Sequence, residues 1–338
     1  MAHKTLIGGT AYEVKGGKTK VNGTAYGIAK GRTLVGGTGH EIPFSPYAPN
    51  FADNDWATII AACQNNEVPD TWKVGDNKTM TINGTSYQID IIGKNHDTYA
   101  DGSGTAPLTF QMHDSYTSNY AMNSSNSNTG GWAYSSMRDT HLPAIFALMP
   151  SEVQAAIKAV KKLTSAGAKS STINTTADML FLLSEIEIFG STSYSKNGEG
   201  SQYAYYSAGN SKVKKRNGTA GAWWERSPRG DIATHFCYVL HTGVAGNYNA
   251  TTKYGVSFAF CFGKGAKMIS FTYSGVLYYA EEGMTWAEWV NSGYNTDGAT
   301  INGTDVCFYE NYAVYYNSPY KKVVATDTIT DGVGVSDT

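Results

Sequence analysis

The stretch that decides the fold class is Ile7-Gly8-Gly9-Thr10-Ala11-Tyr12-Glu13-Val14, which recurs as Val21-Asn22-Gly23-Thr24-Ala25-Tyr26-Gly27-Ile28 and as Val35-Gly36-Gly37-Thr38-Gly39-His40-Glu41-Ile42. The three copies follow one another at a constant offset of fourteen residues. Their Gly-Gly and Asn-Gly pairs supply the positive φ angles that two-residue hairpin turns require. Each copy therefore predicts two short strands joined by a tight turn.

One hairpin of this size cannot bury an apolar face alone, so the repeats must pack on something. We expect residues 1–44 to stack on one another, on neighbouring copies of the chain, or on a larger particle. The alternative is an unstructured glycine-rich leader. It explains the glycine content but not the fixed positions of the aliphatic and tyrosine residues.

Composition supports a mainly β protein. The 338 residues include 37 Gly and 24 Tyr, a mixture that favours short strands, tight turns and amphipathic contact surfaces. A hydrophobic share of 41% is enough for at least one sizeable core. Only 16% of the residues are charged and the net charge is −2, so we expect no nucleic-acid partner. The expected class is α+β, mainly β.

The cysteines and the amino terminus indicate where the protein is made. The four cysteines are far apart and lack the close pairs of zinc or redox sites, which favours buried free thiols at Cys63, Cys237, Cys261 and Cys307. The amino terminus has no apolar signal core, and the longest apolar run, residues 144–149, is too short to span a bilayer. We expect synthesis in a cytoplasm and no membrane insertion.

Local patterns divide the rest of the chain. Asn83-Gly84 predicts another hairpin, and Ser151 with Gln154 resembles a capping box that opens a helix ending near Gly167. Further signals predict strands at 178–184, 223–228 and 254–260, a short helix at 285–290 and a hairpin turn at 301–304. The predicted parts are hairpin repeats at 1–44, a central domain at 45–265 and a small β-rich domain at 266–338.

The candidate catalytic and metal-binding motifs of the sequence are all incomplete. Gly16-Gly17-Lys18-Thr19 lacks the earlier glycine of a phosphate-binding loop, and the matching turn Gly31-Arg32-Thr33 identifies it as part of the repeat. Asn95, His96, Asp97 and Asp101 lack the alternation of an EF-hand loop, although a structural calcium ion is the minor alternative there. We expect Glu185 with Glu187, and the run 214–216, to be solvated, and we expect no enzymatic activity and no cofactor.

A binding surface is the remaining candidate site. Between residues 230 and 254 the chain combines aromatic rings with adaptable polar groups among small residues, as recognition loops do. The alternative is an ordinary surface loop. The predicted ligand-binding residues are His235, Tyr238, His241, Asn247, Tyr248 and Asn249.

Four motifs, at 71–76, 91–97, 181–185 and 223–228, resemble a domain of unknown function that is frequent in phage minor structural proteins and bacterial surface proteins. The resemblance covers residues 55–263. It implies a C-type-lectin-like fold, shared with formylglycine-generating enzymes and with hypervariable receptor-binding proteins of some phages. The chain has Ser257 where that family has an arginine, and it lacks a counterpart to the catalytic cysteine pair of the enzymes. The resemblance therefore implies recognition without catalysis.

The combined interpretation is a phage virion structural protein, associated with the tail or tail tip, that displays a lectin-like domain to a host-surface glycan or protein. Residues 283–296 are similar to segments of tail proteins from phages of Gram-positive bacteria. The expected partners are other virion proteins, through residues 1–44, further copies of the chain in a homo-oligomer, and the host receptor. Assembly in the bacterial cytoplasm would place it on the virion. Capsid decoration, or a purely structural tail role without receptor binding, is the alternative, and a cell-wall hydrolase is the least favoured.

Overall fold

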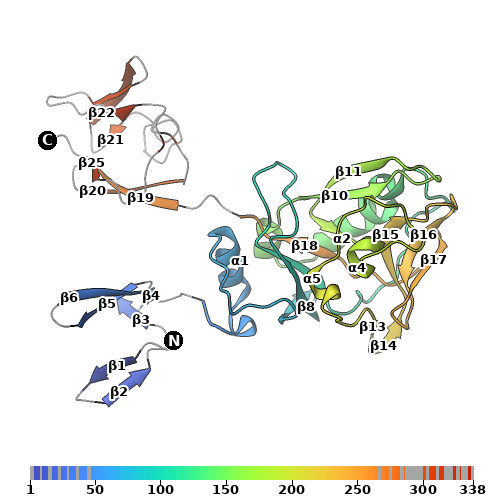
Figure 1. Ribbon diagram of the computed structural model, residues 1–338, viewed down its shortest axis with the longest axis horizontal. Helices are drawn as coiled ribbons and strands as arrows, with labels where there is room; N and C mark the ends of the chain where they lie inside the picture. The colour runs from blue at the N-terminus through green and yellow to red at the C-terminus, as the bar shows by residue number, and fades with distance from the viewer. Residues whose placement is uncertain are drawn as a thin grey trace.

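The computed structural model describes every residue from 47 to 264, and outside that range it describes the backbone of the strands named below and a bridge between Thr285 and Thr328 (Figure 1). Of the residues that are described in full, strands hold 32% and helices 19%, which confirms the expected α+β, mainly β class. The sheets are small and almost entirely antiparallel. The division of the chain at residues 44 and 265 stays a prediction.

The three repeats each form an antiparallel hairpin. Each register places the predicted Gly-Gly or Asn-Gly pair between its two strands, and each hairpin is a two-stranded sheet of its own. The pairs are β1 Lys4–Ile7 with β2 Thr10–Glu13, β3 Gly17–Val21 with β4 Thr24–Ile28, and β5 Lys30–Val35 with β6 Thr38–Pro43. The predicted pairing of two short strands in each repeat is therefore confirmed.

The carboxy-terminal strands form two further sheets. One contains β19 Met268–Tyr273, β20 Val276–Glu281 and β25 Gly334–Val335, the last of which runs parallel to β19. The other contains β21 Thr300–Ile301, β22 Thr304–Tyr309, β23 Tyr312–Tyr315 and β24 Val323–Val324. The β21–β22 pair confirms the predicted hairpin. Of the helix predicted at 285–290, Thr285 is described and forms a bridge with Thr328, whereas residues 286–290 and the Cys307 thiol lie outside the described part of the chain.

The centre of the molecule is a five-stranded antiparallel sheet. Its order is β12 Leu180–Phe181, β18 Ala259–Cys261, β9 Leu108–Met112, β8 Thr85–Lys94 and β7 Asn77–Ile82. Asn83 and Gly84 join β7 to β8 with φ angles of 47° and 76°. Two successive positive φ angles define the turn that suits a two-residue hairpin, so the Asn-Gly prediction is confirmed here.

The two faces of this sheet are buried in different ways, because side chains alternate along a strand. Phe110 on β9 packs against Phe51 and Trp56, which belong to η1 Phe51–Asp53 and α1 Trp56–Gln64. The next residue, Gln111, points the other way and accepts a hydrogen bond from Tyr206 on α5 Ala204–Ser207 at 2.7 Å. One face is thus an aromatic core, and the other buries polar side chains.

A second sheet carries the predicted site. It consists of β15 Trp223–Pro228, β16 His235–Val239 and β17 Ala245–Asn249. Around it lie two hairpins, β10 Val160–Ser165 with β11 Ile173–Asp178 and β13 Lys214–Arg216 with β14 Thr219–Gly221. The remaining short elements are η2 Gly131–Tyr134, the π-helical turn η3 Met137–His141, α2 Leu142–Phe146, α3 Ser151–Ala156 and α4 Glu185–Phe189.

The helix predicted to run from Ser151 to near Gly167 is wrong over its second half. Helix α3 ends at Ala156, and β10 begins at Val160. Ser151 makes no side-chain cap, because Pro150 occupies the position before the helix. Strand pairing along all of β10 with β11, together with the burial of Lys162 in ion pairs, outweighs the helical spacing of the aliphatic residues.

The structure bears on two further predictions, the buried free cysteines and the absence of membrane insertion. Cys63, Cys237 and Cys261 are buried free thiols, as predicted. The described helices are too short or too polar to span a bilayer.

Candidate functional site

The predicted binding loop is a β-hairpin formed by β16 and β17. Its register pairs His235 with Asn249, and Tyr238 with Gly246. Five of the six predicted residues therefore lie on the two strands. His241 lies in the exposed connection at the opposite end of the hairpin from His235, so the structure does not bring it to the others.

Tyr238 and Tyr248 share one face of the hairpin and join a third ring. The centroid of Tyr254 lies 4.8 Å from that of Tyr238, in a stacked arrangement, and 6.0 Å from that of Tyr248. Trp224 on β15 packs beneath, 4.9 Å from Tyr254. Tyr248 is 46% exposed, whereas Trp224 is buried. We call Tyr238, Tyr248 and Tyr254 the tyrosine platform.

Burial fixes the protonation state of the platform. It raises the pKa of Tyr254 to about 12 and also raises the pKa of Tyr238. Both hydroxyls therefore keep their protons at neutral pH and can donate as well as accept hydrogen bonds. A surface that combines ring faces with such hydroxyls suits a ligand that is apolar on one side and hydroxylated on the other.

The polar residues of the predicted site form a separate group, on the face of the hairpin opposite to Tyr238 and Tyr248. Asn247 Oδ1 lies 2.7 Å from His235 Nδ1 and accepts a hydrogen bond from Arg229 at 2.6 Å. Asn249 Oδ1 accepts a hydrogen bond from Asn126 at 3.2 Å. These contacts fix both amides with their oxygens engaged, so their NH2 groups can donate to a ligand. The His235 ring, 6.2 Å from that of Tyr248, connects the two groups.

The expectation that Glu185 and Glu187 are solvated is wrong, because both are buried on α4. Glu185 accepts hydrogen bonds from the backbone N–H groups of Ser193, Tyr194 and Ser195. Glu187 completes a capping box with Ser184. The sequence signal for it was Ser184-Glu185-Ile186-Glu187, the serine-to-glutamate spacing of that motif.

Glu187 also belongs to a buried network of ion pairs. The Glu187 carboxylate forms a bidentate ion pair with Arg226 of β15. It also lies 2.8 Å from Lys162 Nζ of β10. Lys162 in turn lies 2.7 Å from Asp97 Oδ1. We call Asp97, Lys162, Glu187 and Arg226 the buried charge cluster. A cavity of about 610 Å³ reaches three of its members, Asp97, Lys162 and Glu187.

Two more buried carboxyl groups lie near this cluster. Burial raises the pKa of Glu199 to about 7, although Ser227 and the Ser165 N–H donate hydrogen bonds to it. Glu225 is fully buried, and neither of its oxygens has a hydrogen-bond partner among the described residues. Burial, together with Glu185 and Glu199, raises the pKa of Glu225 well above its usual value, which favours the protonated carboxyl group.

The residues considered for calcium point to different places. Asp97 is buried beside Lys162, whereas Asp101 forms a surface ion pair with Lys158 at 2.9 Å. Within the part of the chain that the structure describes, no group of three or more His, Cys, Asp or Glu side chains is arranged to hold a metal ion. Lys214, also expected to be solvated, is buried and donates to the carbonyls of Met112 and His113.

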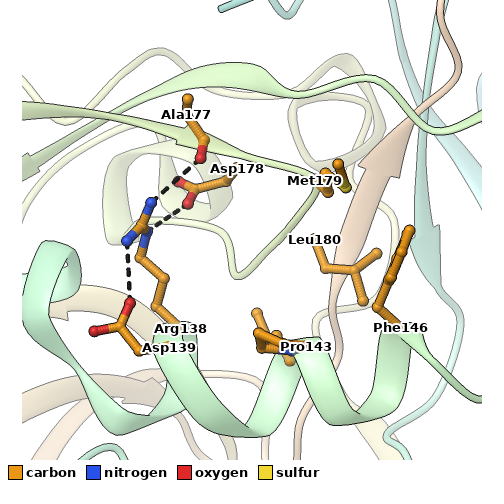
Figure 2. Close-up of a pocket in the computed structure, with 9 residues that line it drawn as sticks. Arg138, Asp139, Pro143, Phe146, Ala177, Asp178, Met179 and Leu180 are labelled. Atoms are coloured by element: carbon orange, nitrogen blue, oxygen red, sulfur yellow. Dashed lines mark hydrogen bonds and ion pairs between the residues drawn. The ribbon is translucent and has the colours of Figure 1, made fainter.

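A smaller cavity of about 320 Å³ lies between α2 and the end of β11 (Figure 2). Figure 2 shows Phe146, Pro143, Met179 and Leu180 around its apolar side and Arg138 at its polar end. Arg138 pairs with buried Asp178 at 2.5 Å and also donates to the carbonyl of Ala177. Because its guanidinium is already engaged, this cavity offers an apolar wall more than a free charge.

Comparison with known proteins adds one match. Residues 108–263 match the model of a family described as Domain of unknown function (DUF6273). The matched range contains β9, most of the buried charge cluster and the whole β16–β17 hairpin. No curated protein and no solved structure matches the chain. The family description assigns no activity, so the links to phage particles and to a lectin-like fold stay predictions.

Sequence reasoning missed three supporting residues of the site. Tyr254 and Trp224 complete the aromatic cluster, and Arg229 orients Asn247. Tyr254 lay close to the predicted residues in sequence but was assigned to a core strand. The pairing of β15 with β16, which brings Trp224 opposite Tyr238, has no local sequence signal.

Proposed function

We propose that the chain is a non-enzymatic structural protein of a phage particle, on or near the tail, that binds a host-surface glycan or protein through the β16–β17 hairpin. The observation that supports this proposal is the tyrosine platform, whose outer ring, Tyr248, is 46% exposed. Ring faces bind the apolar faces of sugars and peptides, and the platform hydroxyls provide directional hydrogen bonds. The amides of Asn247 and Asn249 lie on the other face of the hairpin, where they can contact only a ligand that reaches past its edge.

Replacing Tyr248 by alanine should weaken binding of the full chain at least tenfold, about 1.4 kcal/mol, because Tyr248 is the most exposed ring of the platform. Binding is measured by adsorption to host cells and on a glycan array. Tyr134→Ala is the matched control, since Tyr134 is 75% exposed on η2 and outside the platform. Equal binding by Tyr248→Ala and the parent chain would contradict the assignment of this site.

The six strands of the amino-terminal repeats favour a second role, in which the protein only decorates a capsid or builds a tail. Each hairpin is a two-stranded sheet, so its outer edges are available for pairing with other virion proteins or with further copies of the chain. Deleting residues 1–44 should then abolish incorporation into particles, while Tyr248→Ala leaves infectivity intact. Particle composition, measured by gel electrophoresis of purified virions, and plaque counts separate this role from receptor binding. Normal incorporation of the truncated chain would contradict attachment through the repeats.

A further inference from the structure

Lys162, Asp97 and Glu187 form a buried triad. Lys162 Nζ lies 2.7 Å from Asp97 Oδ1 and 2.8 Å from Glu187 Oε1. The exposed fractions of the three side chains are 3%, 2% and 3%. An amine, a carboxyl group and a second carboxyl group are therefore held in contact, largely shielded from water.

The surroundings of the triad favour reaction over solvation. The ring of Phe181 lies 4.2 Å from Lys162 Nζ. Asp97 Oδ2 accepts hydrogen bonds from Thr109 at 2.6 Å and from Tyr203 at 2.9 Å. Burial raises the pKa of Tyr203 well above its usual value, so its hydroxyl remains a donor. Two fixed donors on one carboxyl oxygen are what a tetrahedral intermediate of acyl transfer needs.

We propose that Lys162 and Asp97 condense to a side-chain amide bond, an isopeptide cross-link, with Glu187 as the proton carrier. The N–C bond forms between Lys162 Nζ and Asp97 Cγ, and the bond from Cγ to Oδ1 breaks. Of the three ammonium hydrogens of Lys162, one remains on the amide nitrogen and two leave with Oδ1 as water. The reaction therefore consumes one ammonium and one carboxylate, releases one water molecule, and needs no other reactant.

The first step is a proton transfer along the 2.7 Å contact, from the Lys162 ammonium to Asp97 Oδ1. Burial alone opposes ionisation of the Asp97 carboxyl group. The ammonium of Lys162 and the hydrogen bond from Thr109 nevertheless hold the pKa of Asp97 below its usual value, so the reactive pair is the minor form. Close contact raises the effective concentration of the amine enough to compensate for a small reactive fraction.

Glu187 then carries protons between the nitrogen and the leaving oxygen. It removes a proton from Lys162 Nζ after attack and returns it to Oδ1, which leaves as water. Burial opposes ionisation of Glu187, but Arg226 and Lys162 outweigh it and hold the pKa of Glu187 below its usual value. Arg226 keeps Glu187 paired after the reaction. When the charge on Lys162 disappears, Glu187 still has its bidentate partner and is not left as an unpaired buried charge. The cavity beside the triad gives the released water a way out.

The cross-link would join the segment after β8 to β10, between residues 65 apart in the chain. Covalent closure of a long loop restricts the unfolded chain and slows unfolding, as a disulfide does, but without dependence on redox conditions. This is a useful property for a chain that works outside a cell.

The test is the intact mass of the purified full-length chain, measured after denaturation. We expect a mass lower by one water molecule than the sequence requires, and a proteolytic fragment in which the peptide containing residue 97 is branched onto the peptide containing residue 162. A mass equal to the sequence mass would overturn the proposal. This measurement needs no variant, so it does not depend on how well a variant folds.

Variants locate the bond and its proton carrier. Lys162→Arg keeps the positive charge but has no amine to condense, so its mass should equal the sequence mass. Persistent water loss in this variant would place the dehydration elsewhere, for example in a succinimide at Asp101-Gly102, and would overturn the proposal. Asp97→Asn should lose ammonia instead of water. Lys158→Ala, which removes the exposed ion pair with Asp101, is the matched control and should retain the full loss. Folded Glu187→Gln should remain uncross-linked, whereas complete cross-linking would overturn the role of Glu187.

Discussion

Replacing Arg226 by methionine should lower the free energy of unfolding by about 3–5 kcal/mol, the cost of removing the bidentate partner of a buried charge. Arg226 is fully buried and donates to Glu187 through both terminal nitrogens. It also donates to Thr164 Oγ1 at 3.0 Å and to the Glu199 carbonyl at 2.8 Å. One side chain thus ties β15 to α4, β10 and the loop after α4.

Methionine has a volume similar to that of arginine. The lost free energy of unfolding would therefore reflect the missing charge and hydrogen bonds more than a change in packing. The matched control is Arg216→Met on β13, where the arginine is partly exposed and makes one long hydrogen bond, 3.4 Å, to the Thr117 carbonyl. That substitution should change the free energy of unfolding by no more than about 0.5 kcal/mol. Urea unfolding followed by tryptophan fluorescence measures both. A loss below about 1 kcal/mol for Arg226→Met would show that Glu187 does not depend on this partner for its charge.

The features that sequence predicted best are those set by local backbone chemistry. The Asn83-Gly84 turn requires two positive φ angles, which few residue pairs adopt easily. The hairpin could therefore be predicted from these two residues alone. The same reasoning located β1–β6 from their glycine pairs. The mixture of aromatic rings and adaptable polar groups placed the candidate site on one segment, and the structure assembles most of that segment as one hairpin.

The features that sequence missed depend on contacts between distant segments. Lys162 is buried while its neighbour Leu163 is exposed, which reverses the pattern that hydrophobicity suggests. The reason is that partners of Lys162 lie 65 residues earlier, at Asp97, and on α4, at Glu187. The same long-range pairing explains why the helix predicted past Ala156 is a strand, and why two glutamates expected in solvent form part of the core.

Glu225→Gln should make the pH dependence of stability flatter than that of the parent chain. Glu225 on β15 is buried without a hydrogen-bond partner among the described residues, and burial raises its pKa well above the usual value. In the unfolded chain it ionises at about pH 4.3. Between that pH and its folded pKa, the folded protein holds a proton that the unfolded chain has released. Its stability contribution is therefore complete below about pH 4.3 and is lost as pH rises.

The expected size is about 1.4 kcal/mol of relative stability for each pH unit in that window. The glutamine variant should match the parent near pH 4 and become increasingly the more stable of the two above it, as measured by urea unfolding at each pH. Titrating groups that do not interact with Glu225 are present in both proteins and cancel in the difference. Glu199, whose charge helps to raise the pKa of Glu225, contributes to that difference. Glu152→Gln, at an exposed position of α3, should follow the parent at every pH. Parallel curves for Glu225→Gln and the parent would mean that Glu225 ionises in the folded protein, and that water or a moving cation reaches the interior of β15.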